Sequence, residues 1–302
     1  MFRRFAVFLI AFLFFQIFAA NVLAQDDDEV VKVDSSIVVL NASITDVAGK
    51  QISGLKQSQF RVFEDGVEQP ISFFAAEETP FAAAILIDTS GSMEQRVSLA
   101  RSAAIKFLEG LRAEDVVAIY NFDSKVKQIQ DFSNADYLAD AFYDLKANGM
   151  TVLNDAIRDA SKALSGRSEK RKAIIVLSDG EDTQSSSSAE KALRAALAGD
   201  ILIYTVDMSS VETGGKQRMQ NQGVLKNFAE KTGGFFVATP GGIAMRDAFQ
   251  RIVTELGNQY TIGYQPLQTK TDGKWHALEL RINRSNLTIR TRKGYNAPKA
   301  KK

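Results

Sequence analysis

The chain has 302 residues, of which 45% are hydrophobic and 24% are charged, a balance typical of globular proteins and unlike that of disordered or collagen-like chains. Lys and Arg total 37 and Asp and Glu total 36, so nucleic acid is not an expected partner, because proteins that bind it carry a basic surplus. The chain has no cysteine and one histidine, which excludes disulfides, thiolate nucleophiles and metal sites rich in cysteine or histidine.

Residues 1–24 have the order of regions found in a secretory signal peptide. A basic start with Arg3 and Arg4 is followed by an apolar run from Phe5 to Ala20, and small residues precede Gln25. We therefore expect an exported protein, periplasmic or extracellular. The alternative is an uncleaved inner-membrane anchor at residues 5–24, which is about long enough to span a bilayer, and only in that case is membrane contact expected.

Two flanking segments, residues 25–78 and 259–296, alternate apolar and polar residues as half-buried strands do. The expected strands are 36–44, 59–64 and 69–74 in the first segment and 259–264, 276–282 and 287–291 in the second. Because each segment has few strands, we expect the two to pair into one small β-sandwich-like module, with two separate β appendages as the alternative. Residues 297–302 form a basic tail.

Between these segments, residues 79–258 alternate continuous apolar runs with helical patterns. The expected strands are 82–88, 116–122, 173–179, 201–206 and 234–238, and the expected helices are 94–111, 137–145, 153–164, 189–198, 224–231 and 243–256. Repeated strand–helix units predict an α/β domain with a doubly wound, mostly parallel sheet. Residues 185–188 and 213–216 are expected to be flexible loops.

Oxygen-bearing side chains gather where the expected strands end. Asp88 ends the first strand of the domain and is followed at once by Ser90 and Ser92, Asp179 ends a central strand, and Thr151 precedes a helix. The carboxyl ends of parallel strands form the binding edge of such a sheet. An all-oxygen set suits a hard cation, Mg²⁺ first, with Mn²⁺ or Ca²⁺ as alternatives. Its two carboxylates neutralise a divalent ion, which leaves an open position for a carboxylate from outside.

The spacing Asp-x-Ser-x-Ser at 88–92, together with Thr151 and with Asp179 in Ser-Asp-Gly, resembles the metal-ion-dependent adhesion site of von Willebrand factor type A domains. The resemblance covers about residues 79–258. Residues 59–74, 259–264 and 293–295 are also similar to bacterial von Willebrand type A-related proteins described from Acidobacteria. The resemblance implies that the five residues hold a divalent cation, which binds an Asp or Glu of a protein partner. It also implies that the helix at 243–256 shifts on binding.

Other interpretations compete with this one. Ser90 or Ser92 would, in the plainest alternative, only cap a helix. Asp123, Glu181 and Asp182 are candidates for a partner-binding rim, with solvated charges as the alternative. For the whole chain, the favoured function is an exported adhesion or assembly module without enzymatic activity. The alternatives are a structural envelope protein whose metal only stabilises loops and a metal hydrolase, which the sequence disfavours because it offers no evident general base.

Overall fold

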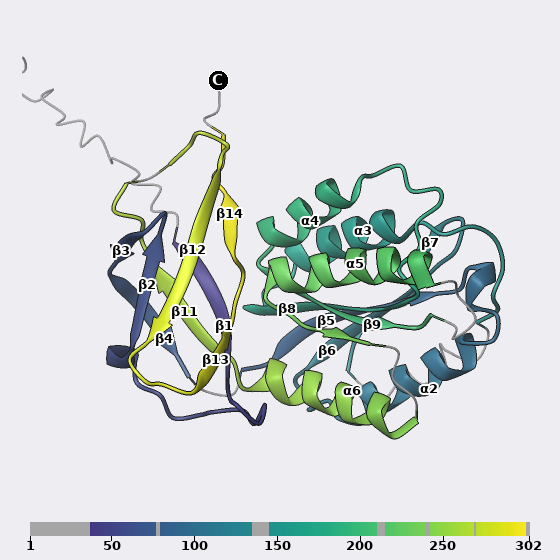
Figure 1. Cartoon of the computed structure of the whole chain (residues 1–302), viewed down its shortest axis with the longest axis horizontal. Coiled ribbons are helices and arrows are strands. Elements are labelled where there is room, and N and C mark those ends of the chain that lie inside the picture. The colour runs from purple at the N-terminus through teal and green to yellow at the C-terminus, as the bar shows by residue number, and fades with distance from the viewer. Residues whose placement is uncertain are drawn as a thin grey trace, which may run out of the picture. The chain divides into compact units, whose positions relative to one another are not determined.

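The computed structural model describes residues 37–76, 79–134, 145–209, 215–238, 242–268 and 270–299, which belong to one compact unit (Figure 1). The leader at 1–24 lies outside the described residues, as does all but the last residue of the helix predicted at 137–145. Among the helices in the described ranges, none is both long and apolar enough to cross a bilayer.

The α/β domain is built on a six-stranded sheet with the order β10-β9-β8-β5-β6-β7. The strands are β5 (Phe81–Asp88), β6 (Val116–Phe122), β7 (Val126–Ser133), β8 (Arg171–Ser178), β9 (Ile201–Asp207) and β10 (Phe236–Val237). Every pair is parallel except β6 with β7. The continuous apolar runs become the central strands because β5 and β9 are buried along their whole length. The antiparallel edge strand β7 was not predicted.

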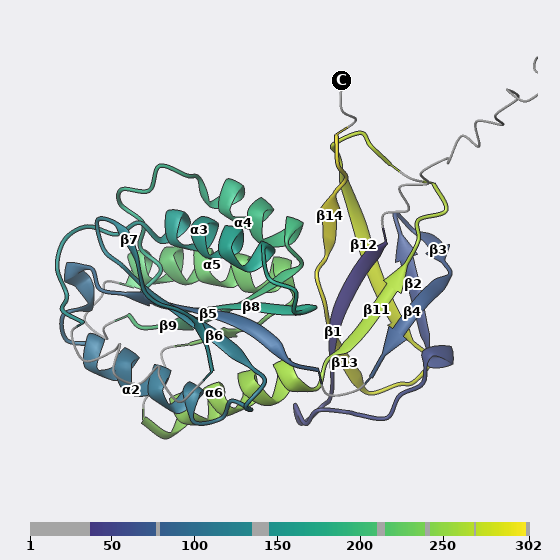
Figure 2. The ribbon, with the colours of Figure 1, turned by 180° about the vertical axis from the view of Figure 1, so that it is seen from behind.

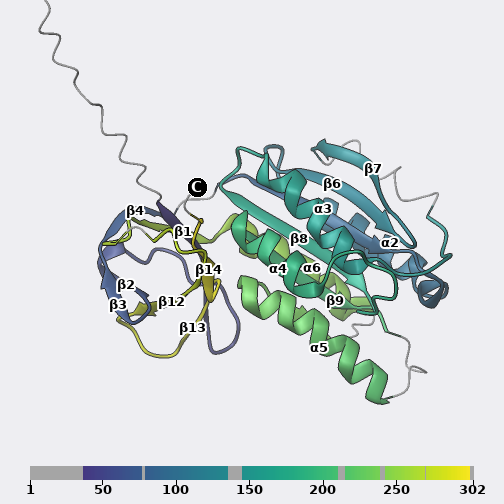
Figure 3. The same cartoon turned by 90° about the horizontal axis from the view of Figure 1, so that it is seen from above.

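Helices cover both faces of this sheet, as Figure 3 shows from above. They are α2 (Val97–Leu108), α3 (Leu153–Ser165), α4 (Ala189–Ala198), α5 (Gly215–Thr232) and α6 (Gly242–Gly257). One apolar cluster joins α2 and α6 to the sheet, and a second joins α3, α4 and α5 to its other face. The predicted doubly wound α/β fold is therefore confirmed. The predicted loop at 213–216 is wrong for Gly215 and Lys216, which open α5.

The β segments on either side of this domain pair into two four-stranded sheets, with the orders β13-β1-β11-β4 and β14-β12-β2-β3 (Figure 2). The strands are β1 (Val38–Asp46), β2 (Phe60–Glu64), β3 (Val67–Gln69), β4 (Ile71–Ala75), β11 (Tyr260–Tyr264), β12 (Trp275–Ile282), β13 (Leu287–Arg290) and β14 (Gly294–Asn296). Each sheet contains strands from both segments, and one apolar cluster lies between the sheets. We call this part the β module. It is the β-sandwich-like unit that the alternation predicted.

A fully buried arginine connects α6 to the start of β8. The guanidinium of Arg171 donates to the carbonyls of Leu256 at 3.2 Å, Gly257 at 2.6 Å and Gln259 at 2.5 Å. The last carbonyls of a helix have no partner within the helix and carry a partial negative charge, so a cation there stabilises the helix end. Arg171 therefore fixes the point at which α6 leads into β11.

Candidate metal site at the carboxyl edge of the sheet

The first candidate loop leaves β5 at Asp88, whose side chain is fully buried. Its Oδ1 accepts a hydrogen bond from the Ser90 amide at 2.9 Å, and its Oδ2 accepts one from the Ser178 hydroxyl at 2.6 Å. Burial raises the pKa of Asp88 to about 7, the charge of Asp179 adds to this shift, and hydrogen bonds from Ser178 and Ser90 offset part of it. Asp88 is therefore a buried carboxyl whose hydrogen-bond partners in the described ranges carry no positive charge.

The hydroxyls of Ser90 and Ser92 lie 3.1 Å apart, the first buried and the second exposed. Ser90 precedes a short 3-10 turn, η2 (Gly91–Met93), yet makes no side-chain capping bond, and α2 starts after Arg96. Ser90 thus occupies the N-cap position of η2, as the alternative interpretation expected, but its side chain makes no capping bond there. The hydroxyls of the two serines lie together beside a buried carboxyl.

The second loop, which leads to Thr151, contacts the first loop through a pair of glycines. The Gly91 amide donates to the Gly149 carbonyl at 3.1 Å, two residues before Thr151, whose side chain is buried. Gly149 has a positive φ of 80°, and a Cβ there would lie 2.5 Å from the hydroxyl of Ser124, so only glycine fits this contact.

The third loop follows β8 and carries Asp179, which is 8% exposed. Its Oδ1 accepts a hydrogen bond from the Glu181 amide at 3.1 Å. The Thr151 carbonyl accepts hydrogen bonds from the amides of Thr183 and Gln184, both at 3.0 Å, and the Thr151 amide donates to the Thr183 hydroxyl at 2.9 Å. Direct contacts therefore join all three loops, although their residues are up to about ninety positions apart in the chain.

The three rim candidates differ in their surroundings. Asp123 is half-buried and accepts a hydrogen bond from Lys125 in its own turn. Glu181 is half-buried beside Asp179. Asp182 accepts from the Asn154 amide at 2.7 Å and from Ser185, so it is an internal bond acceptor.

Two contributors to this edge were not predicted. Ser178 bonds Asp88 and also accepts a hydrogen bond from the Gly180 amide. Thr183 bonds Thr151. A single apolar run hid the orientation of Ser178, because a strand buried on both faces has no alternation to read. Residues 185–188 were expected to form a flexible loop, and hydrogen bonds with α3 connect Ser185, Ser186 and Ser187 of this loop to the domain.

A separate acidic group in the β module also has the spacing to hold a metal ion: Glu64, Asp65 and His276. The ammonium of Lys270 lies 2.6 Å from Asp65, 3.5 Å from Glu64 and 3.1 Å from the His276 ring. Burial lowers the pKa of His276, but hydrogen bonds with Asp65 and Asp272 outweigh burial and leave this pKa raised. A cation of the chain itself already lies among these side chains.

The family model of the von Willebrand factor type A domain matches residues 83–181. No curated protein sequence matches the chain significantly. A von Willebrand factor type A structure from Catenulispora acidiphila has 13% identity and a TM-score of 0.50 over 89% of this chain and 76% of that chain. At this identity the likeness shows the fold alone.

Two further structures are similar. The three N-terminal domains of the type V pili tip protein Mfa5 from Porphyromonas gingivalis share 11% identity over 86% of this chain and 68% of that chain, with a TM-score of 0.49. A D319A mutant of the PilB minor pilin from Streptococcus sanguinis shares 16% identity over 61% of this chain, with a TM-score of 0.48, and the match spans 63% of its length. The sheet and its helical layers agree with the family match, so this chain is similar to the von Willebrand factor type A domain over residues 83–181.

Proposed function

We propose that this chain is an exported adhesion or assembly module whose α/β domain binds a divalent cation through Asp88, Ser90, Ser92, Thr151 and Asp179. The observation that carries the proposal is the fully buried Asp88, which lies beside two hydroxyls and feels the charge of Asp179. A buried carboxylate with no cationic partner is costly, and a bound cation removes that cost.

The donor set supports a hard ion. Carboxylates and hydroxyls are the oxygen ligands that Mg²⁺ prefers, and Mn²⁺ or Ca²⁺ would accept the same atoms. Two carboxylates balance the charge of the dication, so a further anionic ligand has to come from a partner. An Asp or Glu of a protein partner meets this requirement, and the exposed Ser92 marks the side from which it would approach.

We propose no enzymatic reaction at this site. The single histidine of the chain lies on β12 in the β module, where its ring nitrogens contact Asp65 and Asp272. The candidate ligands are thus proposed to bind a cation and a carboxylate, with the histidine of the chain placed in the β module rather than beside them. The export step rests on the composition of residues 1–24, and an intact mass that starts at Gln25 would test it.

Titration calorimetry tests the cation site. The wild-type chain is expected to bind Mg²⁺ and Mn²⁺ saturably at 1:1, and Asp179→Ala is expected to lose that binding. Asp123→Ala is the matched control, because it removes a half-buried carboxylate whose hydrogen bond, within the described residues, is to the Lys125 amide of its own turn. Absence of binding by the wild type, or equal loss in both variants, would contradict the proposal.

The partner step needs a second experiment. Capture of a protein from an envelope extract by immobilised wild type is expected to require Mg²⁺, to be reversed by chelator and to fail with Asp179→Ala. If Asp179→Ala lowers stability yet captures the same protein, the cation only stabilises loops, and the chain acts as a structural envelope protein.

A further inference from the structure

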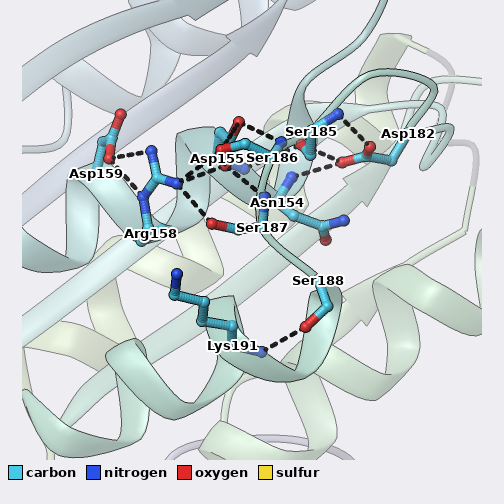
Figure 4. Close-up of polar contacts among 10 residues, drawn as sticks. All are labelled: Asn154, Asp155, Arg158, Asp159, Asp182, Ser185, Ser186, Ser187, Ser188 and Lys191. Carbon is cyan, nitrogen blue, oxygen red and sulfur yellow. Dashed lines mark hydrogen bonds and ion pairs between the residues drawn. The ribbon is translucent and has the colours of Figure 1, made fainter.

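The loop after Asp179 is tied to helix α3 by a polar network that Figure 4 shows. We call this network the α3 clamp; its members are Asn154, Asp155, Arg158, Asp182, Ser185, Ser186 and Ser187. The clamp lies between two proposed ligand segments, because α3 begins two residues after Thr151 and the loop begins at Asp179.

Asp155 is the centre of the clamp. Its Oδ2 accepts a hydrogen bond from the Ser186 amide at 2.8 Å, and its Oδ1 accepts one from the Ser187 amide at 3.0 Å. Both oxygens also lie 3.0 Å from the Ser186 hydroxyl. Burial raises the pKa of Asp155, but these bonds and the charge of Arg158 outweigh it and leave the pKa lowered, so Asp155 is ionised when it holds the loop.

Arg158 braces the same contacts from the next turn of α3. Its Nη1 donates to Asp155 at 2.7 Å and to the Ser187 hydroxyl at 2.5 Å, while its Nε donates to Asp159 at 2.8 Å. Asp159 therefore shares the arginine with Asp155, but in the described part of the chain it makes no hydrogen bond to the loop.

Asp182 closes the clamp at the other end. Its Oδ2 accepts hydrogen bonds from the Asn154 amide at 2.7 Å and from the Ser185 hydroxyl at 2.6 Å. Asn154 is the second residue of α3, so Asp182 satisfies a first-turn amide that has no partner within the helix. With the contacts between Thr151 and Thr183, the loop is held to α3 along its length.

We propose that Asp155 is a positioning residue that fixes the spacing of Thr151 and Asp179 before a cation arrives and thereby favours Mg²⁺ over Ca²⁺. The inference rests on the proposed function. Mg²⁺ demands near-ideal octahedral ligands at about 2.0–2.1 Å, whereas Ca²⁺ accepts longer and more variable distances. A fixed spacing of Thr151 and Asp179 therefore favours Mg²⁺, the smaller ion. If that spacing becomes variable, the affinity for Mg²⁺ falls more than the affinity for Ca²⁺.

The test compares Mg²⁺ and Ca²⁺ affinities of the full chain and three variants by calorimetry. In Asp155→Asn an amide NH₂ replaces one acceptor, so one loop amide loses its partner. The Mg²⁺ Kd is expected to rise about tenfold, as for other residues that orient metal ligands, and the Ca²⁺ Kd less than about threefold. Asp159→Asn is the matched control, with the same charge change on the same helix beside the same arginine, and is expected to leave both affinities unchanged.

Arg158→Met is a second test in case Asp155→Asn misfolds. It leaves Asp155 in place and removes only the contacts that Arg158 makes with Asp155 and Ser187. Its expected effect is a smaller fall, about threefold, in Mg²⁺ affinity. An unchanged ratio of Mg²⁺ to Ca²⁺ affinity in both Asp155→Asn and Arg158→Met would overturn the inference even if their melting temperatures fall. Absence of Mg²⁺ binding by the wild type would instead overturn the proposed function.

Discussion

Gly180 follows Asp179 and has a conformation that only glycine adopts without strain. Its φ is 82°, and a Cβ there would lie 2.6 Å from the Asn221 carbonyl oxygen and 2.9 Å from a side-chain carbon of Leu225. The residue therefore sets both the direction of the Asp179 loop and its distance from α5.

Gly180→Ala is expected to destabilise the chain by about 3 kcal/mol, because left-handed strain and a clash with fixed backbone add together. Gly49→Ala is the control, since Gly49 has nearly the same φ of 80° but nothing within 4 Å of the added Cβ. It should cost only about 1 kcal/mol. Urea unfolding of both variants measures the loss in free energy of unfolding. Equal losses would show that α5 moves to make room for the added Cβ at residue 180.

Sequence reasoning located the proposed ligands because each follows a strand or precedes a helix, and such ends are legible from hydrophobic patterning. It did not find Ser178, Thr183 or Asp155, since each acts through a contact across loops distant in the chain. Residues 185–188 show the limit well. A serine run suggests flexibility by composition, whereas three of its members are fixed by one carboxylate of α3 or by the neighbouring Asp182.

At the scale of elements, the fold was predictable where burial is uniform or strictly alternating. Strand β5 coincides with a continuous apolar run, and strand β12 coincides with a stretch that alternates apolar and polar residues. The edge strand β7 is only half-buried, so its pattern is weak. Helix α5 begins nine residues earlier than its apolar positions indicate, because its first turns are polar and largely exposed.

Buried polar contacts hold the last turn of helix α6 to the strands around it. Glu255, only 2% exposed, accepts a hydrogen bond from the Tyr204 hydroxyl at 2.9 Å and pairs with Arg290 of β13. Arg171 binds the carbonyls that follow. The resemblance implies a shift of this helix on binding, and these contacts oppose one at its C-terminal end.

We therefore expect hydrogen exchange in the last turn of α6 to stay unchanged when Mg²⁺ is added. Glu255→Ala should speed exchange there, because it leaves Arg290 and Tyr204 without their shared acceptor. Asp247→Ala, which removes an exposed acid from the same helix, should not. Protection that changes with Mg²⁺ in the wild type would show that the helix moves despite these contacts.

At the scale of the whole molecule, the segment between β13 and β14 joins the β module to the α/β domain. Arg292 donates to the carbonyls of Val39 on β1 at 2.5 Å and Leu197 on α4 at 3.3 Å, and it pairs with Asp200. The Lys293 amide donates to the Lys231 carbonyl of α5 at 3.3 Å. Because Arg292 and Leu197 are buried, separating the two parts would leave polar groups unpaired, and we expect them to unfold together.

Two probes can test this coupling independently. The single tryptophan, Trp275, lies on β12 in the β module, whereas every α-helix in the described ranges lies in the α/β domain. Mg²⁺ at about one hundred times its Kd should stabilise the domain by about 2.7 kcal/mol. If the parts unfold together, tryptophan fluorescence and helical circular dichroism should shift by the same amount in urea, although the proposed ion site contains no residue of the β module.

Asp179→Ala should abolish the Mg²⁺ shift of both probes, which assigns the effect to the proposed site. Arg292→Met should separate the probes, so that Mg²⁺ still moves the helical signal while the tryptophan midpoint stays behind. A tryptophan midpoint that ignores Mg²⁺ in the wild type would mean that the β module folds on its own. In that case, cation binding in the α/β domain would not be transmitted through the β module to a partner bound there.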